Sequence, residues 1–132
     1  MAYTMTRRFD GTVAQAREAI ESSLGEEGFG ILSEIDIGST LREKVGEDVG
    51  EYEILGACNP PLAFEGVSAE RQLGALLPCN VIVYESLADD EEVYIAAVDP
   101  VTLLDVADNP DLDDIAIEVK ERLERALDDA AA

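Results

Sequence analysis

The chain has 132 residues, of which 30 are acidic and 9 basic, and its formal net charge at pH 7 is −21. This length suits one domain, here taken as residues 1–132, and the scattered basic residues exclude the clustered positive charge that nucleic-acid binding requires. Because 47% of the residues are hydrophobic, the acid excess indicates a folded domain with an acidic coat, not a disordered chain.

The first third of the chain predicts a strand, a long helix and a second strand. Residues 3–9 carry Thr, Tyr and Phe and end at the turn signal Asp10-Gly11. Thr12 and Gln15 form a capping-box pattern that begins a helix. The apolar residues of this helix recur at helical spacing: Val13, Ala16, Ile20 and Leu24. Residues 30–37 alternate, which predicts a half-buried strand with Ile31, Ile35 and Ile37 on its apolar side.

The middle of the chain predicts two further strands with short helices beside them. Residues 39–45 favour a helical turn closed by Gly46, and residues 52–58 form a strand that Asn59-Pro60-Pro61 stops. Residues 62–71 favour a short helix. Residues 79–85 contain four consecutive apolar or aromatic residues, so we expect a strand covered on both faces.

The last third of the chain predicts a hairpin strand and a long helix. Residues 93–99 pair most simply with the preceding strand, and residues 101–107 favour a helical turn. Asn109-Pro110 predicts the start of the last helix, with an N-cap residue followed by proline at the first helical position. Its apolar stripe comprises Leu112, Ile115, Ala116, Val119, Leu123, Ala126 and Leu127. On its exposed face, Glu118 with Arg122 and Glu121 with Arg125 have the spacing of helical ion pairs.

The order of these elements predicts an α+β fold of the type β-α-β(4)-α. We expect a mostly antiparallel sheet with the two long amphipathic helices packed on one face.

The acidic coat favours a halophilic protein over an acidic patch for a basic partner. Acidic residues are spread over nearly every predicted loop and helix face, and Lys44 and Lys120 are the only lysines. Molar salt screens the repulsion between such charges. We therefore expect the stability of the protein to rise with salt concentration.

The sequence predicts a cytoplasmic protein that does not enter the membrane. No apolar run approaches the roughly 18 residues that span a bilayer, and residues 1–4 begin no signal-peptide pattern. In the cytoplasm Cys58 and Cys79 are expected to be thiols. With two cysteines and no histidine in the chain, a zinc site is poorly supported, and we expect no metal.

Two similar sequence segments contain these cysteines. Residues 55–63 read LGACNPPLA, residues 76–85 read LLPCNVIVYE, and Asp99-Pro100 follows. If the two strands are antiparallel neighbours, the end of one lies near the beginning of the next, so both thiols meet at one rim of the sheet. Such a pair suits disulfide exchange, a soft metal or an electrophilic ligand, whereas buried cysteines also serve simply as small core residues.

These two segments are the basis of a resemblance to the domain-of-unknown-function 302 family, which covers nearly the whole length of the chain. The resemblance implies a β-α-β(4)-α fold related in architecture to half of the TATA-binding protein, and it implies no reaction. The family motif falls on six residues, which are our candidates for ligand binding: Cys58, Asn59, Pro60, Cys79, Asn80 and Asp99.

Three hypotheses of function follow. The first is a small-molecule-binding or sensing domain, working as a homodimer, with its pocket at the Cys58/Cys79 rim and a ligand or cofactor of unknown identity. The second is a thiol-dependent enzyme or redox protein that uses Cys58 or Cys79 as its nucleophile. The third is a structural or partner-binding module with inert core cysteines. None of the three involves nucleic acid or a membrane.

Overall fold

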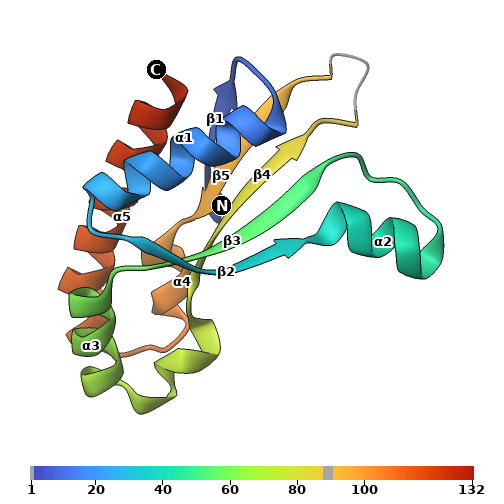
Figure 1. Cartoon of the computed structure of the whole chain (residues 1–132). Helices are drawn as coiled ribbons and strands as arrows, with labels where there is room; N and C mark the ends of the chain where they lie inside the picture. The colour runs from blue at the N-terminus through green and yellow to red at the C-terminus, as the bar shows by residue number, and fades with distance from the viewer. Residues whose placement is uncertain (1, 88–90) are drawn as a thin grey trace.

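The computed structural model describes residues 2–87 and 91–132, and its centre is a five-stranded antiparallel sheet with strand order β1-β5-β4-β3-β2. The strands are β1 (Thr4–Phe9), β2 (Gly30–Asp36), β3 (Tyr52–Cys58), β4 (Cys79–Glu85) and β5 (Val93–Val98). The long helices α1 (Val13–Glu26) and α5 (Asp113–Ala131) cover one face of this sheet (Figure 1). The predicted α+β class and the β-α-β(4)-α order are therefore confirmed.

The shorter helices lie at the ends and edge of the sheet. They are α2 (Ile37–Val45), α3 (Pro60–Ala69) and α4 (Pro100–Asp105), with the 3₁₀ helices η1 (Arg71–Leu76) and η2 (Pro110–Leu112). Helices α3, η1 and α4 gather at one end of the sheet, whereas α2 projects sideways beyond the β2 edge (Figure 1). None of the helices in the described part of the chain is long and apolar enough to cross a membrane.

The core lies between the sheet and the two long helices. The capping box predicted at Thr12 is present and begins α1. The largest fully buried side chains of this layer are Ile20, Leu24, Leu55, Val81, Val83, Ile95, Leu123 and Leu127. Burial of each such side chain contributes about 1.5–3 kcal/mol, so this layer holds α1 and α5 against the strands.

The prediction that one side of β2 is apolar is wrong. The register shifts between Ile31 and Ser33, and this bulge interrupts the alternation of side chains. Ile31 packs against the core, Ile35 is 48% exposed, and Ile37 already belongs to α2.

The prediction that β4 is covered on both faces is also wrong. Cys79, Val81 and Val83 are buried beneath the helices, whereas Ile82 and Tyr84 alternate with them and are only half-buried on the opposite face. Four consecutive apolar or aromatic residues in β4 therefore indicate that both faces of the sheet are apolar. They do not indicate that helices cover both faces.

One of the two predicted ion pairs of α5 forms. Arg122 lies 3.1 Å from Glu118, as expected. Arg125 instead donates two hydrogen bonds to the carboxylate of Glu27, which lies just after α1. This contact ties the two long helices together, and helical spacing could not reveal it.

Candidate functional site

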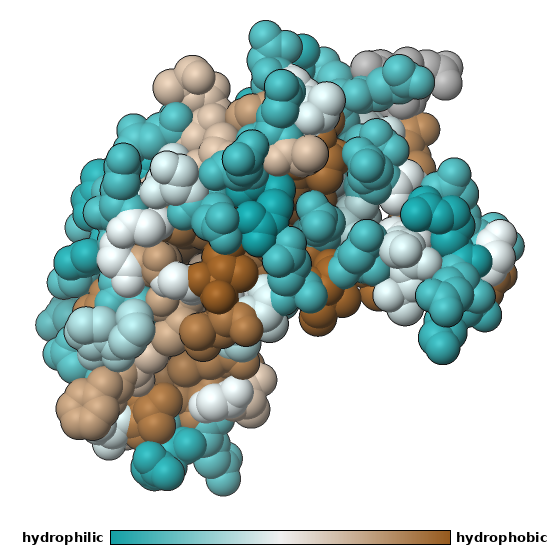
Figure 2. Space-filling view, in the orientation of Figure 1, coloured by the Kyte–Doolittle hydropathy of each residue, from teal (hydrophilic) through white to brown (hydrophobic). Residues whose placement is uncertain are grey.

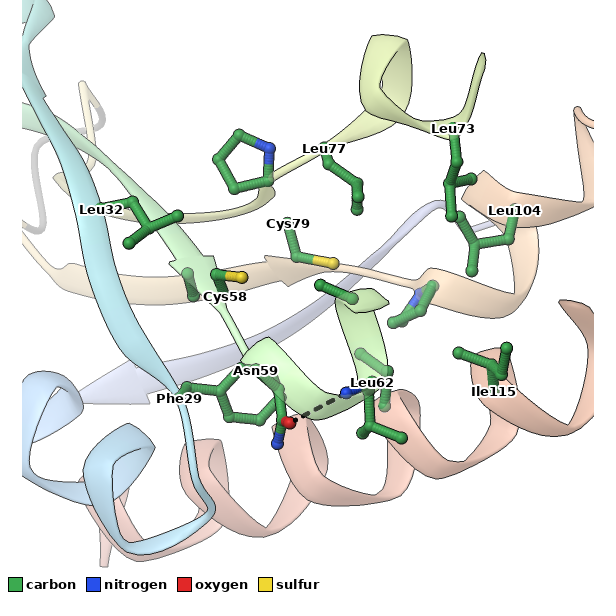
Figure 3. Close-up of a pocket in the computed structure, with 15 residues that line it drawn as sticks. Phe29, Leu32, Cys58, Asn59, Leu62, Leu73, Leu77, Cys79, Leu104 and Ile115 are labelled. Carbon is green, nitrogen blue, oxygen red and sulfur yellow. Dashed lines mark hydrogen bonds between the residues drawn. The ribbon is translucent and has the colours of Figure 1, made fainter. Parts of the chain in front are cut away.

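A cavity of about 260 Å³ lies at the end of the sheet where β3 stops and β4 begins. Its walls come from the strand ends, from α3, η1 and α4, and from the beginning of α5 (Figure 3). The lining is almost entirely apolar, and its larger side chains are Phe29, Leu62, Leu73, Leu77, Leu104 and Ile115. Two thiols and one amide are its polar groups, from Cys58, Cys79 and Asn59.

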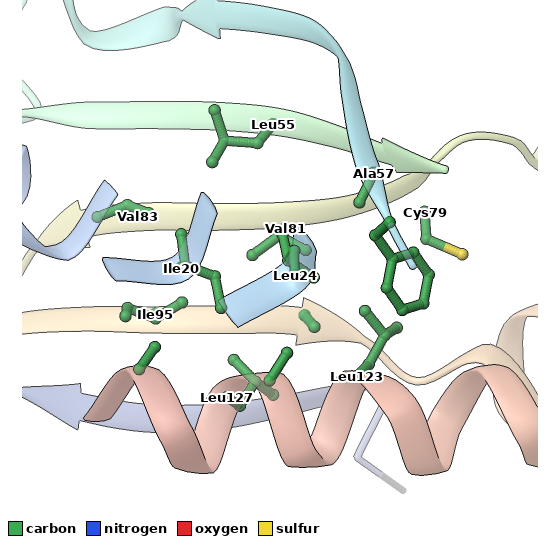
Figure 4. Packing of buried hydrophobic residues seen from close by; sticks show 14 of the residues in the cluster. Ile20, Leu24, Leu55, Ala57, Cys79, Val81, Val83, Ile95, Leu123 and Leu127 are labelled. Atoms are coloured by element: carbon green, nitrogen blue, oxygen red, sulfur yellow. The ribbon is translucent and has the colours of Figure 1, made fainter. Parts of the chain in front are cut away.

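Strand pairing places the two cysteines beside each other on this cavity. Ala57 is the partner of Cys79 in the β3/β4 register, so Cys58 follows directly at the end of its strand. Both are free thiols, and both side chains point into the cavity (Figure 3). Cys79 is 7% exposed and belongs to the core cluster, with its sulfur directed toward the end of the sheet (Figure 4). Cys58 is half-buried.

The surroundings keep both thiols protonated at neutral pH. Burial raises the pKa of the Cys58 thiol. The pKa of Cys79 is raised to about 11, first by burial and second by the neighbouring Cys58. A basic side chain nearby would have the opposite effect, and the described lining of the cavity contains none.

Asn59 lies on the cavity, but both ends of its amide make structural contacts. Its side-chain oxygen accepts a hydrogen bond from the backbone N–H of Leu62 and caps α3, at 3.4 Å. Its side-chain nitrogen donates to the backbone carbonyl of Glu27 at 3.3 Å. Pro60 is the first residue of α3, and its fixed φ suits this position.

The structure places Asn80 and Asp99 away from the cavity lining. Asn80 is exposed and pairs with Gly56 on the face that the long helices do not cover. Asp99 caps α4 by accepting a hydrogen bond from Val101 N–H, and Lys120 donates to its second oxygen at 2.9 Å. Three of the six candidates, Cys58, Asn59 and Cys79, are thus brought together. A ligand-binding role for any of the six stays a prediction.

Sequence reasoning missed most of the cavity wall. Leu73, Leu77 and Leu104 come from three separate segments and contribute one side chain each, so no periodic pattern marks them. Leu32 also lines the cavity although it is 69% exposed, and its place in the bulged strand β2 gives no sequence signal of that role. Brown and tan residues gather at the end of the molecule where α3 lies (Figure 2).

The chemistry of this cavity suits an apolar ligand better than a metal. Within residues 2–87 and 91–132, no three His, Cys, Asp or Glu side chains lie close enough to hold a metal ion. Protonated thiols are soft, weakly polar contacts.

These features define the class of protein: a small α+β domain with an antiparallel sheet, helices on one face, and an apolar cavity at the sheet's end. The family model described as "Domain of unknown function DUF302" matches residues 3–130, so the chain belongs to this family. The chain is also similar to the crystal structure of an uncharacterized conserved DUF302 protein from Bacillus stearothermophilus. The two are 27% identical over 100% of both chains, with a TM-score of 0.91. No protein with a curated description matches the sequence.

Proposed function

We propose that this domain binds a small, neutral, apolar molecule in the cavity at the end of the sheet. The observation that carries the proposal is an apolar cavity of about 260 Å³ on which two sequence-distant cysteines meet. A cavity of roughly 150 Å³ is enough for benzene, so this one suits a ligand of about two fused rings or an equivalent chain.

The charges of the protein limit the chemical class of the ligand further. The net charge of −21 repels anions from the surface, and the described lining has neither a basic side chain to hold an anion nor a carboxylate to hold a cation. The ligand is therefore an uncharged molecule, held by apolar contact and by the polarizable sulfurs of Cys58 and Cys79. Asn59 shapes the wall by capping α3, and its amide is already engaged on both sides.

The two other hypotheses have less support. A nucleophilic cysteine needs a lowered thiol pKa, and burial raises the pKa of both Cys58 and Cys79. The hypothesis of inert core cysteines agrees with the position of Cys79, which belongs to the core cluster. The same hypothesis does not account for Cys58, which is half-buried at the wall of the cavity.

The working environment that we propose is a salt-rich cytoplasm, with the domain as a homodimer. The excess of 30 acidic over 9 basic residues supports the first part. The apolar sheet face opposite α1 and α5 supports the second part.

Titration with 2-naphthol, a neutral two-ring fluorophore, tests the proposal. In molar KCl, saturable binding at one site per chain is expected. Ala63 lies on the cavity wall in α3, so Ala63→Phe fills the cavity and weakens binding at least about tenfold. Ala69 lies on the same helix and is exposed, so Ala69→Phe is the matched control and leaves binding unchanged.

Two results would overturn the proposal. One is the absence of saturable binding by the unaltered protein. The other is equal affinity in Ala63→Phe and Ala69→Phe, because the probe would then bind elsewhere. Circular dichroism establishes that both variants are folded before affinities are compared.

A further inference from the structure

The sheet face opposite α1 and α5 carries a continuous apolar surface. Its centre is Ile54 and Ile82, and beside them three tyrosines stack in a row across neighbouring strands. The ring centroids of Tyr52 and Tyr84 are 5.3 Å apart, and those of Tyr84 and Tyr94 are 5.7 Å apart. Half-burial of these side chains comes from contact with one another, not from a covering helix.

Acidic residues are missing from the described strand positions of this face. In the five described strands, the positions that alternate away from the helices hold no Asp or Glu, although 30 of the chain's 132 residues are acidic. Arg8 is their one charged residue, and it lies 2.9 Å from Glu92, which directly precedes β5. The helix-covered side of the same strands carries Glu34, Glu53 and Glu85 at its margins. Acidic residues of the described strands thus lie only on the helix-covered side, and Glu92, which pairs with Arg8 and accepts a hydrogen bond from the Tyr94 hydroxyl, lies at the margin of the open face.

Helix α2 adds a second apolar surface beside this face. Gly38 packs against the backbone of Gly50 and so attaches the start of α2 to the strands, while the rest of the helix projects outward (Figure 1). Ser39 and Arg42 border a hollow next to the first turn of α1. At 3.6 residues per turn, the stripe of Ile37, Leu41 and Val45 lies roughly 130° around the helix from them, on the side of the open sheet face. Val45 is 62% exposed.

We propose that the open sheet face and the apolar stripe of α2 form the interface with a second copy of this chain. Two chains of net charge −21 approach with least repulsion where both surfaces lack carboxylates. The described strands of the open face present no carboxylate there, and Glu92 at its margin is paired with Arg8. In a two-fold dimer each copy presents this same face to the other. The two sheets then pack face to face, with Ile54 and Ile82 at the centre. The projecting α2 of each copy provides a wall beside its partner's sheet.

Two isoleucines of equal exposure allow a matched test. Ile35 is 48% exposed on β2 at the open face, and Ile117 is 49% exposed on α5. Sedimentation velocity in molar KCl is expected to show a dimer of the unaltered protein. Ile35→Glu places a carboxylate in the interface and weakens dimerisation at least about tenfold, whereas Ile117→Glu leaves it unchanged. Val45→Glu on α2 is expected to act like Ile35→Glu.

A monomer at all protein concentrations up to the solubility limit in molar KCl would overturn the proposal, since the face would then serve another partner or none. A dimer that withstands both Ile35→Glu and Val45→Glu would overturn it too, because the contact would lie on another surface. Melting curves of all three variants keep loss of folding distinct from loss of the interface.

Discussion

The thiol of Cys79 should react with alkylating reagents a few hundred times more slowly at pH 8 than an ordinary cysteine. Its pKa of about 11 leaves about one molecule in a thousand as thiolate at that pH. A free thiol with a pKa of about 8.5 is roughly one-quarter ionised under the same conditions. The 7% exposure of Cys79 slows the reaction further, because the reagent must reach the end of the sheet.

The assay is alkylation by iodoacetamide, a neutral reagent, in the variant Cys58→Ser, which leaves Cys79 as the only thiol of the chain. Peptide mass spectrometry gives the rate between pH 7 and 10, and the same protein unfolded in guanidinium chloride gives the reference rate. The folded protein should show a rate that rises about tenfold per pH unit with no plateau below pH 10. In the unaltered protein, half-buried Cys58 should react before Cys79.

A plateau below pH 8.5 would refute this reasoning. It would mean that Cys79 carries a lowered pKa and that a positive group near it outweighs burial. The hypothesis of a thiol-dependent enzyme would then replace that of a binding domain.

Three further predictions test stability. Burial raises the pKa of Cys79 from 9.0 to about 11, so the unfolded state loses this proton first as pH rises. The free energy of unfolding should therefore fall by about 2 kcal/mol between pH 9 and 11. Urea titrations should show a smaller fall in Cys79→Ala, and an equal fall would contradict the pKa. The melting temperature should rise from dilute buffer to molar KCl, and a flat or falling value would exclude a halophilic coat. Asn59→Ala should lower the free energy of unfolding by about 1–2 kcal/mol, because α3 loses its N-cap. The Glu27 carbonyl loses the hydrogen bond from Asn59 but keeps the one from Arg122. An unchanged denaturation midpoint would contradict this prediction.

The sequence predicted the parts of the fold that short-range chemistry determines. The capping box at Thr12, the strand β3 with its stop at Asn59, and α5 after Asn109-Pro110 all depend on residues a few positions apart. The meeting of Cys58 and Cys79 needed only one assumption, that their strands are antiparallel neighbours.

What the sequence could not predict depends on contacts between distant residues. The bulge after Ile31 reverses the exposure of β2, and it has no local signal. Arg125 contacts Glu27 instead of Glu121 because tertiary packing brings α1 to α5. Asp99 belongs to the motif that suggested a site, yet its two oxygens are engaged by α4 and Lys120. The cavity is assembled from single apolar residues of separate segments, so only the three-dimensional structure reveals it.

The position of β1 has a consequence for the nascent chain. Strands β2 to β5 are neighbours in the order in which the ribosome makes them, whereas β1, which is made first, lies beyond β5 at the far edge. Until Val93–Val98 has emerged, β1 has no strand to pair with. Strand β1 must therefore wait until the other four strands have been made before it completes the sheet, and a message truncated before Val93 would leave it unpaired.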